Sequence, residues 1–166
     1  MRAGWGEIQF SRLRETMDVH EKDLKPMEQQ PENRCFACGP DNPAGLHMEF
    51  FVGEDGSIFA FPVISGAFDG YPGNVHGGMI ATMLDEVMSK SVRQAGYLAM
   101  TRHIEVDYVR PVPSSARLRI EGRITGDEGR KHWTQGRIRD EEGKILARAK
   151  GLFVEVKRPD AEGADQ

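Results

Sequence analysis

Residues 70–92 read GYPGNVHGGMIATMLDEVMSKSV, and this stretch carries the clearest structural signal in the sequence. Loop-forming residues lead directly into an apolar run with helical spacing. The spacing predicts a helix of about five turns that begins near Gly78 and ends at about Gln94, with Gly96 as its C-terminal stop. One stripe of this helix is expected to face the core, and it consists of Ile80, Met83, Leu84, Val87 and Ser91.

The segments on either side of the helix have the signals of strands: most alternate between apolar and polar residues, residues 130–139 are bracketed by turns, and the last segment is long and mostly apolar. Residues 45–52 and 57–64 flank a GEDG turn and predict a hairpin, with Pro62 at an edge or bulge. Four further strands joined by short turns, and hence antiparallel, are expected at 101–111, 116–125, 130–139 and 144–156. The pattern predicts an α+β fold in which a curved antiparallel sheet of about six strands wraps around one long central helix.

The composition suits one globular domain, since 166 residues with 39% hydrophobic and 29% charged side chains can bury a core. We expect the domain at 35–158, a polar N-terminal extension at 1–34 that is flexible or contacts a partner, and a flexible acidic tail at 159–166. The net charge of −4 argues against a general nucleic-acid binder. No apolar run of about 20 residues and no secretory signal are evident, so we predict a cytoplasmic protein without a membrane partner.

The two cysteines form one C-x-x-C motif, Cys35 and Cys38. A structural zinc site takes four ligands and no second cysteine pair follows, so we interpret both thiols as packing residues. A partial or dimer-shared site that includes His47 stays open, as does a redox pair.

Two adjacent acids in the helix have different surroundings. Glu86 lies four residues before Lys90, the spacing of a solvated ion pair. Asp85 lies at the border of the apolar stripe, where removal from water costs free energy and raises a carboxyl pKa. A carboxylate in that position suits a general base or a nucleophile, although an aspartate partly exposed at the helix edge is the simpler interpretation.

The residues that open the helix suggest a binding site for a developing negative charge. Gly77 and Gly78 offer backbone N–H groups at a helix N-terminus, where such groups lack internal acceptors. This arrangement can polarise a carbonyl oxygen, or the glycines simply permit close packing. His76 either contributes a ring hydrogen bond or caps the helix.

Together, HGG at residues 76–78, Asp85 nine residues after His76, the strand TRHIEVDYVRPVP and the opening CFACGPDNPAGLHMEF resemble the hotdog-fold acyl-CoA thioesterases, in particular the phenylacetate-pathway-like branch. The resemblance covers roughly residues 35–156. It implies hydrolysis of an acyl-CoA to the free acid and CoA by a homodimer or a dimer of dimers with active sites between subunits. No metal is implied, and no cofactor beyond the CoA of the substrate.

The resemblance also implies roles for individual residues. Gly77 would be the oxyanion donor, His76 would support the turn, and Asp85 would be the nucleophile or the general base. Thr101 matches a strand position near the attacking water, although strand alternation places it opposite Ile104 unless a bulge intervenes. Further substrate-binding candidates are Asn74, Gly78, Phe68, Tyr71 and Met79, with Arg102 among the basic residues for CoA.

Two other functions stay open. A hotdog domain without catalysis could bind acyl thioesters as a sensor or assembly module, and the N-terminal extension modestly favours a partner contact. A hotdog hydratase or dehydratase is less favoured, because His76 and Asp85 lie well apart on one helix.

Overall fold

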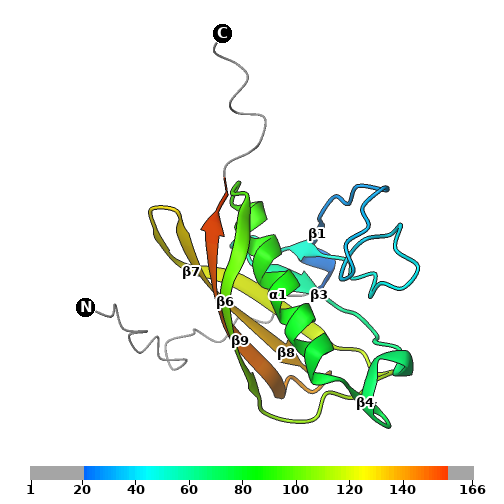
Figure 1. Ribbon diagram of the computed structural model, residues 1–166. Helices are drawn as coiled ribbons and strands as arrows, with labels where there is room; N and C mark the ends of the chain where they lie inside the picture. The colour runs from blue at the N-terminus through cyan, green and yellow to red at the C-terminus, as the bar shows by residue number, and fades with distance from the viewer. Residues whose placement is uncertain (1–20, 157–166) are drawn as a thin grey trace.

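The computed structural model describes residues 21–156; residues 1–20 and 157–166, the latter including the predicted tail at 159–166, lie outside the described residues. One long helix, α1 (Gly77–Gln94), lies across a face of a large antiparallel sheet (Figure 1). The strands follow the order β1-β2-β3-β7-β8-β9-β6. Their bounds are β1 (Lys25–Pro26), β2 (Phe51–Val52), β3 (Ile58–Ala60), β6 (Ala99–Tyr108), β7 (Arg119–Glu128), β8 (Lys131–Arg139) and β9 (Ile145–Glu155). The predicted α+β fold is confirmed, and each of the six predicted segments contains a strand, although the strands predicted at 45–52 and 57–64 are shorter than expected.

The structure adds short elements that the sequence patterns did not reveal. β1 pairs with β2, so Lys25 and Pro26 join the sheet although they precede the predicted domain boundary at residue 35. A short 3₁₀ helix (Gly66–Phe68) leads into a small hairpin of β4 (Asp69–Tyr71) and β5 (Asn74–Val75) just before α1. A second 3₁₀ turn covers Glu21–Asp23. Within residues 21–156, no helix is long and apolar enough to cross a membrane.

The helix approaches the sheet closely because small residues line the strands beneath it. Gly122, Gly136 and Ala149 are register partners across β7, β8 and β9. A Cβ on Gly122 would come within 2.7 Å of the carbonyl oxygen of Val87, so the helix backbone occupies the space of a side chain. This close approach lets the whole predicted stripe of α1 pack into the core, including the polar Ser91.

Candidate active site

The start of α1 presents one unused backbone donor. His76 caps the helix, since its Nδ1 accepts a hydrogen bond from the N–H of Gly78 at 3.0 Å. The N–H of Gly77 donates no hydrogen bond to any acceptor among residues 21–156. At a helix N-terminus such a donor also lies at the positive end of the helix dipole. Gly77, rather than Gly78, is therefore the donor available to a bound carbonyl oxygen.

Tyr108 of β6 supports this end of the helix. Its hydroxyl donates a hydrogen bond to the carbonyl oxygen of Gly77 at 3.1 Å. A Cβ added to Gly77 would be in van der Waals contact with the Tyr108 ring, so the ring lies close to the helix start. Sequence reasoning placed Tyr108 on a strand but found no role for it. No signal in the sequence could have revealed this contact, because it depends on how β6 passes α1.

Asp85, two turns further along α1, is hydrogen-bonded to Thr101 of β6. The Thr101 hydroxyl donates to Asp85 Oδ1 at 2.8 Å. The register of β6 against β9 shifts between Thr101 and His103, so the bulge on which the sequence argument depended is present. This extra residue resets the alternation, and Thr101 can face α1 on the same strand as Ile104.

The surroundings of Asp85 disfavour its charge. Burial raises the pKa of Asp85 above the ordinary value of an aspartate, and the neighbouring charge of Glu86 acts in the same direction. The hydrogen bond from Thr101 opposes both by stabilising the carboxylate. No basic side chain among residues 21–156 forms a salt bridge with Asp85. Asp85 is thus a half-buried carboxylate oriented by one hydroxyl, which is an arrangement suited to accepting a proton.

Most of the other predicted substrate-binding residues lie near the two ends of this site. The His76 N–H donates to the Phe68 carbonyl at 2.9 Å, which places the 3₁₀ turn beside the start of α1. The Asn74 side chain donates to the Pro72 carbonyl at 3.3 Å, so Asn74 does not cap the helix. Tyr71 is exposed on β4, Met79 is half-buried in the first turn of α1, and Arg102 is exposed on β6 next to Thr101.

The ion pair between Glu86 and Lys90 forms, with Lys90 Nζ 3.0 Å from Glu86 Oε1, but its predicted solvated position was wrong. Each side chain is only 15% exposed. The loop that carries Cys35 lies over this part of α1, and Lys90 lies over the ring of Phe50. The helical pattern could not reveal that Glu86 and Lys90 are half-buried, because the residues that lie over them come from far upstream in the sequence.

A curved antiparallel sheet around one long helix defines the hotdog class of α+β folds. Comparisons with known proteins agree: residues 72–147 match the family model of the Thioesterase superfamily. The thioesterase superfamily protein RHA08564 has a TM-score of 0.71 at 31% identity, over 74% of this chain and 60% of that chain. The chain therefore has the hotdog fold and is similar to proteins of the thioesterase superfamily over residues 72–147.

Two further proteins are similar to this chain. Acyl-coenzyme A thioesterase THEM4 of Xenopus laevis is 34% identical over 89 residues, which are 53% of this chain and 40% of that protein. A hypothetical thioesterase of Streptococcus pneumoniae, solved with coenzyme A, has a TM-score of 0.62 at 20% identity, covering 67% of this chain and 87% of that one, and is similar in fold alone. The chain spans about half the length of the curated relatives it matches.

Proposed function

We propose that the chain hydrolyses an acyl-CoA thioester to the free acid and CoA. The observation that carries this proposal is the half-buried carboxylate of Asp85, which no cation among residues 21–156 neutralises and which Thr101 orients. A carboxylate that serves only the fold would be expected to have a positive partner or a place in water. In the proposed reaction, the Asp85 carboxylate acts on water or on the thioester carbonyl.

The reaction needs two groups at the thioester carbonyl. The free N–H of Gly77 would donate to the carbonyl oxygen and stabilise the negative charge that develops on it. Asp85 would either remove a proton from the attacking water or attack the carbonyl carbon itself, forming an anhydride that water then cleaves. In both forms the carbon–sulfur bond breaks, CoA leaves as the thiolate and is protonated, and a carboxylic acid remains. No metal and no further cofactor is required.

Gly77 and Asp85 of one chain cannot both reach the same carbonyl. They lie eight residues apart on α1, which corresponds to ~12 Å along the helix axis at 1.5 Å per residue. We therefore propose that each site combines the Gly77 end of one protomer with the Asp85 of another. Two-fold symmetry then generates two equivalent sites per dimer.

β6 is the strand through which such a dimer would form. It ends the order of strands described, and edge strands expose unpaired backbone groups that can pair with a second copy. Met100 and Tyr108, near its two ends, are 61% and 55% exposed. Thr101 contacts Asp85 and Tyr108 contacts Gly77, so the two half-sites lie at opposite ends of β6. Antiparallel pairing of β6 with its copy would bring each half-site toward the complementary one.

The relatives support this proposal. THEM4 proteins are acyl-coenzyme A thioesterases, and the Streptococcus pneumoniae thioesterase was solved with coenzyme A. The same Streptococcus pneumoniae protein was also solved with alanine in place of an aspartate and of a threonine that are sixteen residues apart, the spacing of Asp85 and Thr101. Phe68, Tyr71 and Met79 are our candidates for the acyl pocket, Asn74 and Gly78 for positioning the thioester, and Arg102 for CoA. The cytoplasmic location and the absence of a nucleic-acid partner stay predictions.

The test is release of free thiol from a panel of acyl-CoAs that differ in chain length and include phenylacetyl and benzoyl types. We expect turnover of at least one member and its loss, by about 10³-fold, in Asp85→Asn, because a general base contributes about 10²- to 10⁴-fold. Binding of CoA should be retained. No release by the wild type, or release that Asp85→Asn retains, would contradict the proposal and favour an acyl-thioester binding module.

A matched pair at Gly77 tests the donor. Gly77→Pro removes the N–H, and proline fits the first helical position after His76, whose ψ of 139° suits a residue before proline. Gly77→Ala keeps the N–H, and its Cβ would lie 3.6 Å from the Tyr108 ring, an ordinary contact. We expect turnover to fall about 10²-fold in the proline variant, and much less in the alanine variant. Equal turnover in the two variants would exclude Gly77 as the donor.

A further inference from the structure

A second cluster of reactive side chains lies apart from the Asp85–Thr101 pair. Cys35 and Cys38 belong to a loop that lies against α1, and Glu86 belongs to the helix itself. The two sulfurs and one carboxylate oxygen all lie within 4.8 Å of one another. Both thiols are free, Cys38 is buried, and Cys35 and Glu86 are half-buried. The proposed thioester reaction makes no use of this cluster.

The spacing of the three atoms is close to that of a tetrahedral zinc site. Zn–S and Zn–O bonds of about 2.3 and 2.0 Å place two ligand atoms of a tetrahedron roughly 3.5 to 3.8 Å apart. Cys35 Sγ lies 3.8 Å from Glu86 Oε2. The other two separations are at most 4.8 Å, so side-chain rotations would bring all three atoms to one ion. Water would complete the coordination, since Cys35 and Glu86 are half-buried and not fully enclosed.

The loop holds the two cysteines in a preset turn. Gly39 donates its N–H to the Cys35 carbonyl at 2.8 Å, and a Cβ at Gly39 would come within 2.4 Å of the Asn33 carbonyl oxygen. Only glycine fits this turn. Asn33 accepts the Cys35 N–H at 3.0 Å and directs its own side-chain N–H toward Cys38 Sγ at 3.4 Å. A donor directed at a sulfur is the kind of outer contact that stabilises a metal-bound thiolate.

The charges of the cluster also balance around a divalent ion. Two thiolates and the Glu86 carboxylate carry three negative charges, of which Zn²⁺ neutralises two. Lys90 supplies the remaining positive charge through Glu86 Oε1, whereas Oε2 is the oxygen that faces Cys35. The ion pair with Lys90 therefore leaves one carboxylate oxygen for the metal.

We propose that Cys35, Cys38 and Glu86 bind one Zn²⁺ ion that fastens the loop to α1. Binding releases the thiol protons to solvent, forms two Zn–S bonds and one Zn–O bond, and involves no oxidation. The ion would tie a loop far upstream to the helix residue next to Asp85. His47, the ligand that the sequence suggested for a partial site, instead lines a separate cavity with Glu21, Glu49 and Phe51.

The full-length chain, reduced and freed of metal with a chelator, provides the test. We expect it to take up about one Zn²⁺ per chain in competition with a chromogenic chelator. Co²⁺ in place of Zn²⁺ should give the sulfur-to-metal charge-transfer absorption of a thiolate site. Glu86→Gln should weaken binding by at least about tenfold, while Glu54→Gln, an exposed acid of the β2–β3 turn, serves as the matched control. The double variant Cys35→Ser/Cys38→Ser should lose both uptake and the charge-transfer band.

In the binding assay, three results would overturn the proposal: no uptake by the wild type, wild-type uptake by the double serine variant, or equal affinity in Glu86→Gln and Glu54→Gln. A measurement of cysteine reactivity in the wild-type chain does not depend on whether the variants fold. Zn²⁺ should slow alkylation of Cys35 by N-ethylmaleimide and should slow formation of a Cys35–Cys38 disulfide in air. Equal rates with and without Zn²⁺ would mean that the pair is a redox or packing pair and not a metal site. These readouts do not depend on thioester hydrolysis, so they stand apart from the proposed function.

Discussion

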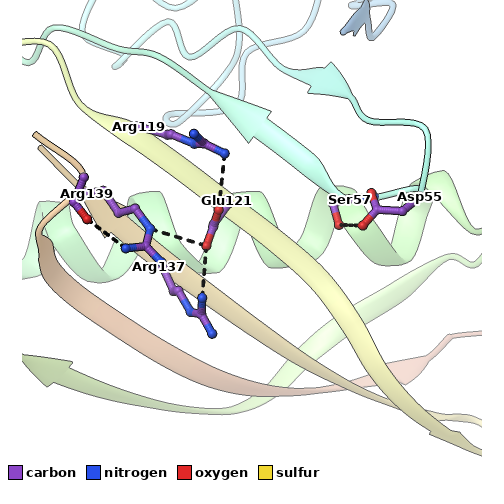
Figure 2. A network of polar contacts seen from close by, with 7 residues as sticks. Asp55, Ser57, Arg119, Glu121, Arg137 and Arg139 are labelled. Carbon is purple, nitrogen blue, oxygen red and sulfur yellow. Dashed lines mark hydrogen bonds and ion pairs between the residues drawn. The ribbon is translucent and has the colours of Figure 1, made fainter. Parts of the chain in front are cut away.

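Asp85 and Glu121 are both acids that folding removes from water, but their surroundings differ. Glu121 of β7 is 6% exposed and forms salt bridges with Arg137 at 3.4 Å, Arg139 at 3.7 Å and Arg119 at 3.9 Å (Figure 2). Asp85 is hydrogen-bonded to the Thr101 hydroxyl and has no salt bridge among residues 21–156. The charge of Glu121 joins β7 to β8, whereas the charge of Asp85 has no such partner among these residues, as the proposed reaction requires.

The largest expected effect comes from exchanging each acid for its amide. We predict that Asp85→Asn lowers thioester turnover by about 10³-fold, whereas Glu121→Gln leaves the turnover of folded protein within about threefold of the wild type. The reason is that only Asp85 lies beside the proposed reacting atoms. Thiol release per folded chain checks this prediction. A comparable loss in both variants would contradict the assignment of a catalytic role to Asp85 and a structural role to Glu121.

The free energy of unfolding should show the opposite order, with the larger loss in Glu121→Gln and not in Asp85→Asn. Glu121→Gln leaves three arginines without their shared counter-charge, and we expect a loss of about 3 kcal/mol in the free energy of unfolding. Asp85→Asn removes a charge whose burial is unfavourable, so its stability should be unchanged or higher. Urea unfolding of the two variants beside the wild type measures both. If Asp85→Asn is the less stable of the two variants, the claim that Glu121 stabilises the fold more than Asp85 is contradicted.

Thr101 allows a finer test of how Asp85 is oriented. Thr101→Val keeps the shape of the side chain and removes the hydroxyl donor, and we predict about a tenfold loss of turnover, equivalent to ~1.4 kcal/mol. Thr101→Ser keeps the donor and should retain most of the activity. Steady-state kinetics on the substrate turned over fastest distinguishes the two variants. Equal activity of the valine and serine variants would mean that this hydrogen bond contributes nothing to the reaction.

The smallest effect is expected at Tyr108, which touches the donor end of the site only through the Gly77 carbonyl. Tyr108→Phe removes one exposed hydrogen bond, and we predict a two- to threefold loss of turnover at most, about 0.5 kcal/mol. The measurement is again thiol release at saturating substrate. A loss as large as that of Asp85→Asn would make Tyr108 a catalytic residue rather than a positioning residue.

The helix and the strands were predictable because each has a period that only one structure satisfies. The apolar stripe from Ile80 to Ser91 specified α1, alternation specified β6 and β7, and flanking turns and a long apolar run specified β8 and β9. Contacts that depend on long-range packing were not predictable. The bulge after Thr101 and the burial of Glu86 beneath the Cys35 loop both depend on segments that are distant in sequence. Local pattern identifies neighbours that are joined by a short turn, but it contains no information on which distant segments meet.

The central claim is that Gly77 of one chain and Asp85 of another act on one thioester, and a complementation assay tests it most directly. Gly77→Pro and Asp85→Asn chains, each with little activity alone, would be refolded together in equal amounts. Random pairing puts both variants in half of the dimers, and each mixed dimer has one intact site of two, so we predict about one quarter of wild-type turnover. A mixture no more active than its two components would contradict a site shared between chains.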